Sequence, residues 1–239
     1  MKSLASHQTL AKTFLGICLL SAFAVASANA ILVTWDFNPG NQNADSGSSA
    51  LTYTQSGYNL TVRGYDNVSG PDTLHELRYK NEAMNGGAFE RGLGLAGTPS
   101  NEFGVNTDGT PTNYLQLDLR SILSLGFTNG MIQVASLQPG EGYVLFGSNS
   151  QGVLGTQLAG TYTGLSFDNQ FVAIPDFGTY QFISVAAASG RVLPVAFQAS
   201  ITPIPEMNVL FPIVGLLVAV SSTQILRRRR AAQAIDNEA

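Results

Sequence analysis

The sequence predicts an all-β protein, an antiparallel two-sheet sandwich over residues 31–202. Short segments rich in β-branched and aromatic residues recur along this stretch, and several of them alternate apolar with polar side chains. Gly or Pro interrupts nearly every interval, and no segment keeps apolar residues at helical spacing for three turns. Segments of this kind bury one face each, so they pair into sheets that pack face to face.

The expected strands are separated by loops rich in Gly, Ser and Asn. They are 31–37, 58–65, 114–119, 131–135, 142–146, 157–162, 171–174, 180–186 and 192–201. One helical turn is expected within 121–127. The Gly-rich segment 85–97 lacks the Gly-Lys-Ser/Thr ending of a phosphate-binding loop, so we interpret it as a turn-rich loop.

The N-terminus has the features of an export signal. Lys2 and Lys12 flank a polar lead, residues 14–25 are apolar, and Ala28-Asn29-Ala30 is a cleavage site with small residues at the required positions. We therefore predict a signal peptide over residues 1–30; the alternative is an uncleaved anchor. The single cysteine, Cys18, lies in this segment, so the exported protein would have no disulfide and no thiolate nucleophile.

The C-terminus predicts a membrane segment. Residues 209–226 carry no charge, and as a helix they would span roughly 27 Å, close to the hydrocarbon thickness of a bilayer. A cluster of positive charge follows at once, made of Arg227, Arg228, Arg229 and Arg230. Such a cluster stays cytoplasmic, which predicts a transmembrane helix with stop-transfer character and a disordered tail over 234–239. The alternative is a buried core helix with a basic cap.

The order of parts in this tail resembles a known sorting signal. Ile204-Pro205-Glu206, the apolar segment and the Arg cluster together resemble, over residues 203–233, the PEP-CTERM signal of Gram-negative bacteria. The resemblance implies that an exosortase, a membrane-bound cysteine peptidase, recognises the motif and processes the protein for the cell surface. Pro205 and Glu206 match the first two motif residues, and Met207 stands where the family has its second Pro.

A second resemblance concerns the β-rich region. Residues 114–119 (YLQLDL), 142–149 (GYVLFGSN) and 180–185 (YQFISV) are similar to strands of the galactose-binding-like, or discoidin-like, jelly roll. The similarity extends over about residues 110–200 and implies a jelly-roll architecture. It implies no particular activity, because one fold carries many functions.

The charge balance of the β-rich region excludes one class of partner. Six basic and thirteen acidic residues lie between residues 31 and 200, a net charge of about −7. Nucleic-acid binding needs clustered Lys and Arg, so no nucleic acid is expected as a partner. The acidic loops instead offer oxygen ligands for Ca²⁺, and we predict Glu90 and Glu102 as candidate ligands of a structural ion. Solvated turns are the alternative.

The residue inventory argues against an enzyme. His75 is the only histidine outside the predicted signal peptide, so a Ser-His-Asp triad is not expected, and we interpret His75 as a surface or strand residue. Glycoside hydrolysis needs a pair of carboxylates, and four glutamates that lie close together in the sequence, between residues 76 and 102, could supply it. These acids are Glu76, Glu82, Glu90 and Glu102.

Sugar binding would need aromatic rings on which pyranose faces stack. The available rings lie mostly in expected strands; they are Trp35, Tyr53, Tyr58, Tyr65 and Tyr79. We expect Trp35 in the core, because it alternates with Thr34 in an apolar strand. The sequence identifies no individual sugar ligand.

These observations predict an exported cell-surface or extracellular-matrix protein with a structural or adhesive role. The expected partners are the exosortase, the bacterial membrane and exopolysaccharide, and no cofactor is expected apart from the structural Ca²⁺ considered above. Two other functions stay open. One is a carbohydrate- or Ca²⁺-binding module with a defined site, and the other is a secreted glycoside hydrolase.

Overall fold

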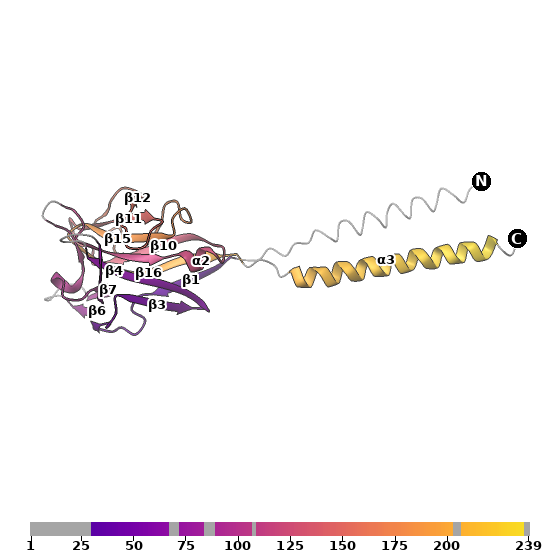
Figure 1. Ribbon diagram of the computed structural model, residues 1–239, viewed down its shortest axis with the longest axis horizontal. Helices are drawn as coiled ribbons and strands as arrows, with labels where there is room; N and C mark the ends of the chain where they lie inside the picture. Colours follow the sequence, from indigo (N-terminus) through magenta and orange to yellow (C-terminus); the bar gives the residue numbers. More distant parts are fainter. Residues whose placement is uncertain (1–29, 67–71, 84–88, 107–108, 203–206, 237–239) are drawn as a thin grey trace. The chain divides into compact units, whose positions relative to one another are not determined.

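A computed structural model of the 239-residue chain describes residues 30–66, 72–83, 89–106, 109–202 and 207–236. One compact unit, Ala30–Thr202, contains all the strands, and the second unit contains the long helix α3 (Figure 1). All strand pairs among the described residues are antiparallel, which confirms the predicted all-β antiparallel class for the first unit.

The strands are mostly short and follow one another closely in the chain. They are β1 (Ile31–Asp36), β2 (Ala44–Asp45), β3 (Ala50–Gln55), β4 (Tyr58–Asp66), β5 (Thr73–His75), β6 (Leu77–Ala83), β7 (Phe89–Leu95), β8 (Phe103–Gly104), β9 (Asn113–Asp118), β10 (Phe127–Ala135), β11 (Gly142–Ser148), β12 (Thr156–Gln157), β13 (Tyr162–Thr163), β14 (Gln170–Ala173), β15 (Phe182–Ser189) and β16 (Arg191–Ile201). The helical elements are η1 (Pro99–Asn101), α2 (Arg120–Leu123) and α3 (Met207–Asp236).

Two large sheets form the body of the β unit. One has the order β1-β16-β10-β14, with β8 paired to β16, and the other has the order β12-β11-β15-β9-β4-β3, with β13 and β5 added at its margins. This arrangement confirms the predicted sandwich character. A third sheet, β2-β6-β7, was not expected from the sequence.

Aromatic side chains join the facing sheets. Trp35 on β1 is 1% exposed, and its ring centroid lies 5.6 Å from that of Phe127 and 5.5 Å from that of Phe197. Tyr58, from the other sheet, meets Phe127 edge-on at 4.8 Å, and its carbonyl oxygen accepts a hydrogen bond of 3.1 Å from Trp35 Nε1. The prediction that Trp35 belongs to the core is confirmed.

The strand pattern follows burial as expected. In β4, the buried Leu60 and Val62 alternate with partly exposed residues, which is the pattern of a strand with one face on the core. β3 and β4 are joined at Ser56 and Gly57, both with positive φ (53° and 83°). A two-residue hairpin of type I′ needs this conformation at both positions, and glycine adopts it without a steric penalty.

Two expectations about local structure are wrong. Segment 157–162 is not one strand, because its ends belong to the separate strands β12 and β13. Segment 85–97 is not a loop, because β7 occupies most of its described part and pairs with β6 along its whole length. The glycines of β7 serve close packing rather than turns: a Cβ on Gly92 would lie 2.8 Å from the carbonyl oxygen of Pro194. The helical turn expected within 121–127 corresponds to α2.

The two ends of the β unit lie side by side. β1 runs antiparallel to β16, and their register pairs Ile31, the first strand residue, with Ile201, the last. β16 in turn lies between β1 and β10. The chain therefore enters and leaves the sandwich at one strand pair.

Helix α3 covers the segment 209–226 and continues to Asp236, so residues 234–236 of the expected disordered tail are helical. Within the described residues, no helix combines the length and apolar character needed to cross a membrane. Arg227, Arg228 and Arg230 are exposed on α3. The predicted signal peptide with Ala28, and the motif residues Pro205 and Glu206, lie outside the described residues, whereas Ala30 is described directly before β1 and Met207 begins α3.

Candidate functional site

A buried lysine lies between two buried glutamates beside the third sheet. The side chain of Lys80, on β6, is 0% exposed, while those of Glu90 and Glu102 are 7% and 4% exposed. Lys80 Nζ donates a hydrogen bond of 2.6 Å to Glu90 Oε2 and a second one to Glu102 Oε1. The two acids predicted as calcium ligands are therefore brought together, on either side of an ammonium group.

Strand pairing places Lys80 and Glu90. In the β6–β7 ladder Lys80 faces Gly92, and Glu90 faces Glu82, so Glu90 is the diagonal neighbour of Lys80 on the same face. Ser136, which follows β10, donates a hydrogen bond of 2.6 Å to Glu90 Oε1. Both oxygens of Glu90 are thus hydrogen-bonded.

Glu102 comes from outside the ladder, directly after η1. Its approach depends on Gly94 of β7, because a Cβ at that position would collide with the backbone of Asn101. Thr98 also holds this turn, since its hydroxyl lies within hydrogen-bonding distance of the carbonyl oxygens of Leu95 (2.9 Å) and Glu102 (3.1 Å). The glycine and the short turn bring Glu102 against Lys80.

The two glutamates of this cluster differ in the direction of their pKa shifts. Burial raises the pKa of Glu102 to about 7, because removal from water outweighs the attraction of Lys80. Burial also acts to raise the pKa of Glu90, but hydrogen bonds from Lys80 and Ser136 hold that pKa below its ordinary value. For Lys80, burial acts to lower the pKa, yet the two glutamates raise it. Glu90 is the carboxylate of the pair, and Glu102 is the group that takes up a proton.

The other predicted acids lie apart from this cluster. Glu76 Oε1 accepts a hydrogen bond of 2.7 Å from the backbone of Gly47, and Glu82 Oε2 accepts one of 3.2 Å from Asn43. Within the described ranges, no group of three or more His, Cys, Asp or Glu side chains could hold a metal ion. The calcium site and the glycosidase carboxylate pair stay predictions.

Lys80 itself was missed by the sequence reasoning. One signal was available, because Lys80 is the only lysine in the chain after Lys12. Arg78 carries the same charge two residues earlier, so charge alone does not distinguish Lys80 from a surface residue. The complete burial of Lys80, however, depends on strand pairing and on η1, which the sequence alone does not give.

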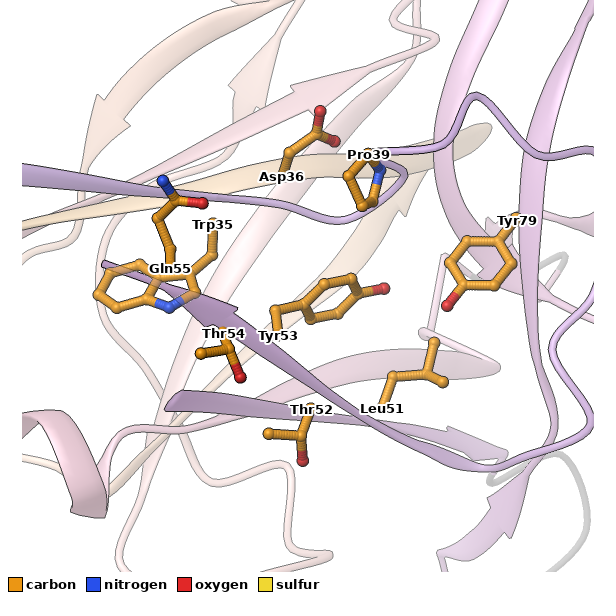
Figure 2. Close-up of a pocket in the computed structure, with 9 residues that line it drawn as sticks. All are labelled: Trp35, Asp36, Pro39, Leu51, Thr52, Tyr53, Thr54, Gln55 and Tyr79. Carbon is orange, nitrogen blue, oxygen red and sulfur yellow. The ribbon is translucent and has the colours of Figure 1, made fainter. Parts of the chain in front are cut away.

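A groove opens between the edge strands β1 and β3 (Figure 2). Its volume is about 320 Å³, and it is lined by Trp35, Asp36, Pro39, Leu51, Thr52, Tyr53, Thr54, Gln55 and Tyr79. Strand alternation places Leu51, Tyr53 and Gln55 on one face of β3, and Figure 2 shows the Tyr53 and Tyr79 rings on the same side of that strand. The groove thus combines aromatic rings with the amide group of Gln55, whereas the carboxylate of Asp36 binds Arg91 and the backbone of Asn38.

Tyr53 is fixed within this groove. Its hydroxyl donates a hydrogen bond of 2.8 Å to the carbonyl oxygen of Phe37, and its ring lies 5.4 Å from that of Phe37. Burial, reinforced by the neighbouring Tyr79, raises the pKa of Tyr53, so the hydroxyl stays neutral. Of the other candidate sugar-binding rings, Trp35 is buried in the core, the partly buried Tyr58 packs against it, and Tyr65 stacks on Tyr114 at 5.2 Å.

His75 lies on β5 and is half-buried, so the prediction of a surface or strand residue is confirmed. Its Nε2 lies 2.7 Å from the carbonyl oxygen of Ala96, and its Nδ1 lies 3.6 Å from Asp66 Oδ2. His75 lines a second groove, of about 400 Å³, together with Glu102, Asn113 and Arg191. This groove adjoins the lysine cluster through Glu102.

Comparison with known proteins gives no family for this chain: no family model matches it, and no curated protein resembles it in sequence.

Proposed function

We propose that this protein is an exported cell-surface or extracellular-matrix module with a structural or adhesive role and no enzymatic activity. Residues 1–30 direct export, and residues 203–233 act as a PEP-CTERM-like sorting tail. The observation that supports this proposal best is the pairing of Ile31 with Ile201 at the two ends of the β unit.

Both proposed processing points fall just outside that strand pair. Cleavage after Ala30 removes no residue of β1, and cleavage near Pro205 removes no residue of β16. The ladder between them, and the core around Trp35, would therefore survive the loss of both termini. A sorted protein needs this property, because it must stay folded once its address segments are gone.

The tail contributes two proposed functions. The apolar stretch 209–226, followed by four arginines, acts as a membrane anchor with its basic end in the cytoplasm. An exosortase then reads Pro205 and Glu206 on the outer side. The polar residues Ser221, Ser222, Thr223 and Gln224 shorten the apolar stretch, which suits an anchor that is held only until processing.

Intact mass and cell fractionation from the native host test the sorting proposal. We expect a wild-type mass that begins at Ile31 and lacks Arg227–Arg230, in the surface or matrix fraction. A Pro205→Ala, Glu206→Ala double variant should keep the full tail in the inner membrane, whereas the control Pro203→Ala should be processed normally. Equal processing of the double variant and the wild type would remove the motif from the proposal.

The groove between β1 and β3 favours a second candidate function, a carbohydrate-binding module. The Tyr53 and Tyr79 rings offer apolar surface, and the Gln55 amide offers hydrogen bonds to sugar hydroxyls beside it. The proposed jelly-roll architecture, with its galactose-binding-like strand motifs, fits this function. Exopolysaccharide of the producing cell is the proposed ligand.

Co-sedimentation with purified exopolysaccharide tests this candidate. We expect Tyr79→Ala to weaken binding about five- to thirtyfold, since loss of a stacked ring removes on the order of 1–2 kcal/mol. The matched control is Leu165→Ala, which removes a side chain that is 65% exposed and does not line the groove. Equal binding by the two variants would exclude the groove as the glycan site.

A further inference from the structure

The lysine cluster is costly as an ordinary ion cluster. Lys80, Glu90 and Glu102 are almost fully removed from water, and burial of charge is unfavourable unless opposite charges balance. One ammonium and two carboxylates would leave a net negative charge inside the protein. The cluster is neutral only when one carboxyl group carries a proton.

The geometry indicates which carboxyl group that is. Glu90 accepts hydrogen bonds at both oxygens, from Lys80 Nζ (2.6 Å) and Ser136 Oγ (2.6 Å), which stabilises its ionised form. Burial raises the pKa of Glu102, so the proton belongs on Glu102. The neutral cluster therefore contains an ammonium, a carboxylate and a carboxylic acid.

These three groups are the components of amide formation. An amine next to a carboxylate has a base to take its protons, and an un-ionised carboxyl group is an acceptable electrophile where a carboxylate is not. Exclusion of water removes the competing solvent from the reacting atoms. We propose that Lys80 Nζ and Glu102 Cδ join spontaneously in an intramolecular isopeptide bond, with Glu90 as the base.

The reaction balances without any cofactor. Glu90 takes a proton from the Lys80 ammonium, and the free amine attacks Glu102 Cδ, where the Nζ–Cδ bond forms. Glu90 passes that proton to the departing hydroxyl and takes a second one from Nζ. The Cδ–OH bond breaks, one water leaves, and Glu90 ends protonated. Nothing is oxidised or reduced.

The surroundings favour the product. The ammonium and the buried carboxylate are replaced by a neutral amide and a neutral acid, so no charge of the cluster stays in the core. The groove that Glu102 lines together with Thr98 and Asn113 gives the released water a route out. The bond would tie β6 to the segment that precedes β8, over the face of β7 that carries Glu90.

The decisive experiment is the intact mass of the purified wild-type protein. We expect a mass lower by one water than the sequence requires, and a proteolytic peptide in which Lys80 and Glu102 are linked. Amine labelling after denaturation provides a second readout, because Lys80 is the only lysine after Lys12 and would be unreactive. An unshifted mass, with Lys80 labelled and cleaved by trypsin, would overturn the proposal and leave an ordinary ion cluster.

Two variants test whether Glu90 acts as the base of this reaction. Glu90→Gln keeps the size of the side chain but removes the base. We therefore expect the intact mass that the sequence requires, without loss of water, and a Lys80 that reacts with the amine label. The control Glu82→Gln, on the same strand as Lys80, should still lose one water, since Glu82 hydrogen-bonds Asn43 at the surface. Loss of water in the Glu90→Gln protein would overturn the role of Glu90. If that variant fails to fold, the wild-type mass still decides whether the bond forms.

Discussion

Arg63 and Asp118 form an ion pair across the neighbouring strands β4 and β9, with Arg63 Nη1 3.1 Å from Asp118 Oδ2. Arg120 binds the same carboxylate from the start of α2, through Nε at 2.9 Å from Oδ1 and Nη2 at 2.7 Å from Oδ2. Burial acts to raise the pKa of Asp118, but the two arginines hold it below its ordinary value. The ionised carboxylate of Asp118 on β9 therefore links this strand to β4 through Arg63 and to α2 through Arg120.

Replacement of Asp118 should change the pH dependence of stability. A carboxyl group with a lowered folded pKa stabilises the protein above its unfolded pKa, 3.8, and loses that contribution as the pH falls through the folded value. We expect Asp118→Asn to lower the free energy of unfolding at neutral pH by about 1–3 kcal/mol and to weaken the loss of stability below about pH 4. Urea unfolding, followed by fluorescence of Trp35, the only tryptophan, measures both effects.

The control for that variant is Asp45→Asn. Asp45 pairs with Arg78 at 2.7 Å, but its side chain is 53% exposed, and exposed pairs contribute less than about 1 kcal/mol. An equal effect of the two substitutions would show that Asp118 gains nothing from its two partners.

The aromatic core should be the most sensitive part of the sandwich. Phe197→Ala removes a fully buried ring that packs against Trp35, so we expect a loss of about 3–5 kcal/mol in the free energy of unfolding. Leu32→Ala, on β1, removes a side chain that is 54% exposed and should change stability by less than about 1 kcal/mol. Chemical unfolding of both variants would contradict this account if their losses were similar.

The β3–β4 hairpin gives a test of backbone conformation alone. At Gly57 a Cβ would meet no atom within 4 Å, but φ is +83°, so Gly57→Ala should destabilise the protein by about 1–2 kcal/mol. Gly160 has the same open space without a positive φ, so Gly160→Ala should be neutral or slightly stabilising. Thermal unfolding of the two variants should therefore differ, and equal melting temperatures would refute the hairpin argument.

Truncation tests whether the β unit is independent. A chain of residues 31–202 should fold and melt within a few degrees of the longer protein, because every strand is kept. A chain of residues 37–202 lacks β1 and with it Trp35, so we expect it to be unfolded or aggregated. Circular dichroism and calorimetry measure this, and a stable 37–202 fragment would contradict the importance given to β1.

The sequence was sufficient where local pattern decides structure. β1, β4, β9, β11 and β16 lie close to their expected positions, because each has an apolar run bounded by turn residues. β7 was misinterpreted because glycines such as Gly92 and Gly94 are found both in turns and in strands that another segment approaches closely, and the sequence does not tell these two uses apart. The two uses are distinguished only by the close contact of Pro194 with Gly92 and of Asn101 with Gly94, and these contacts form only in the folded protein.

The candidate sites were predictable only in part. Glu90 and Glu102 were selected for their chemistry, but their common partner Lys80 depends on the β6–β7 register and on the turn at η1. The groove of Figure 2 was even harder to predict from the sequence, since its two walls come from edge strands of different sheets. Tyr53 and Tyr79 could be named from the sequence, but their neighbourhood could not.

The position of β16 determines how the β unit would carry mechanical load. A pull through the tail would enter at Ile201, and its component along β16 would load a strand that is hydrogen-bonded on both sides, to β1 and β10. Such a force acts in shear, so many backbone hydrogen bonds bear it together instead of opening one after another. A protein held by this end would resist extraction, whereas a strand at the margin of a sheet would peel away.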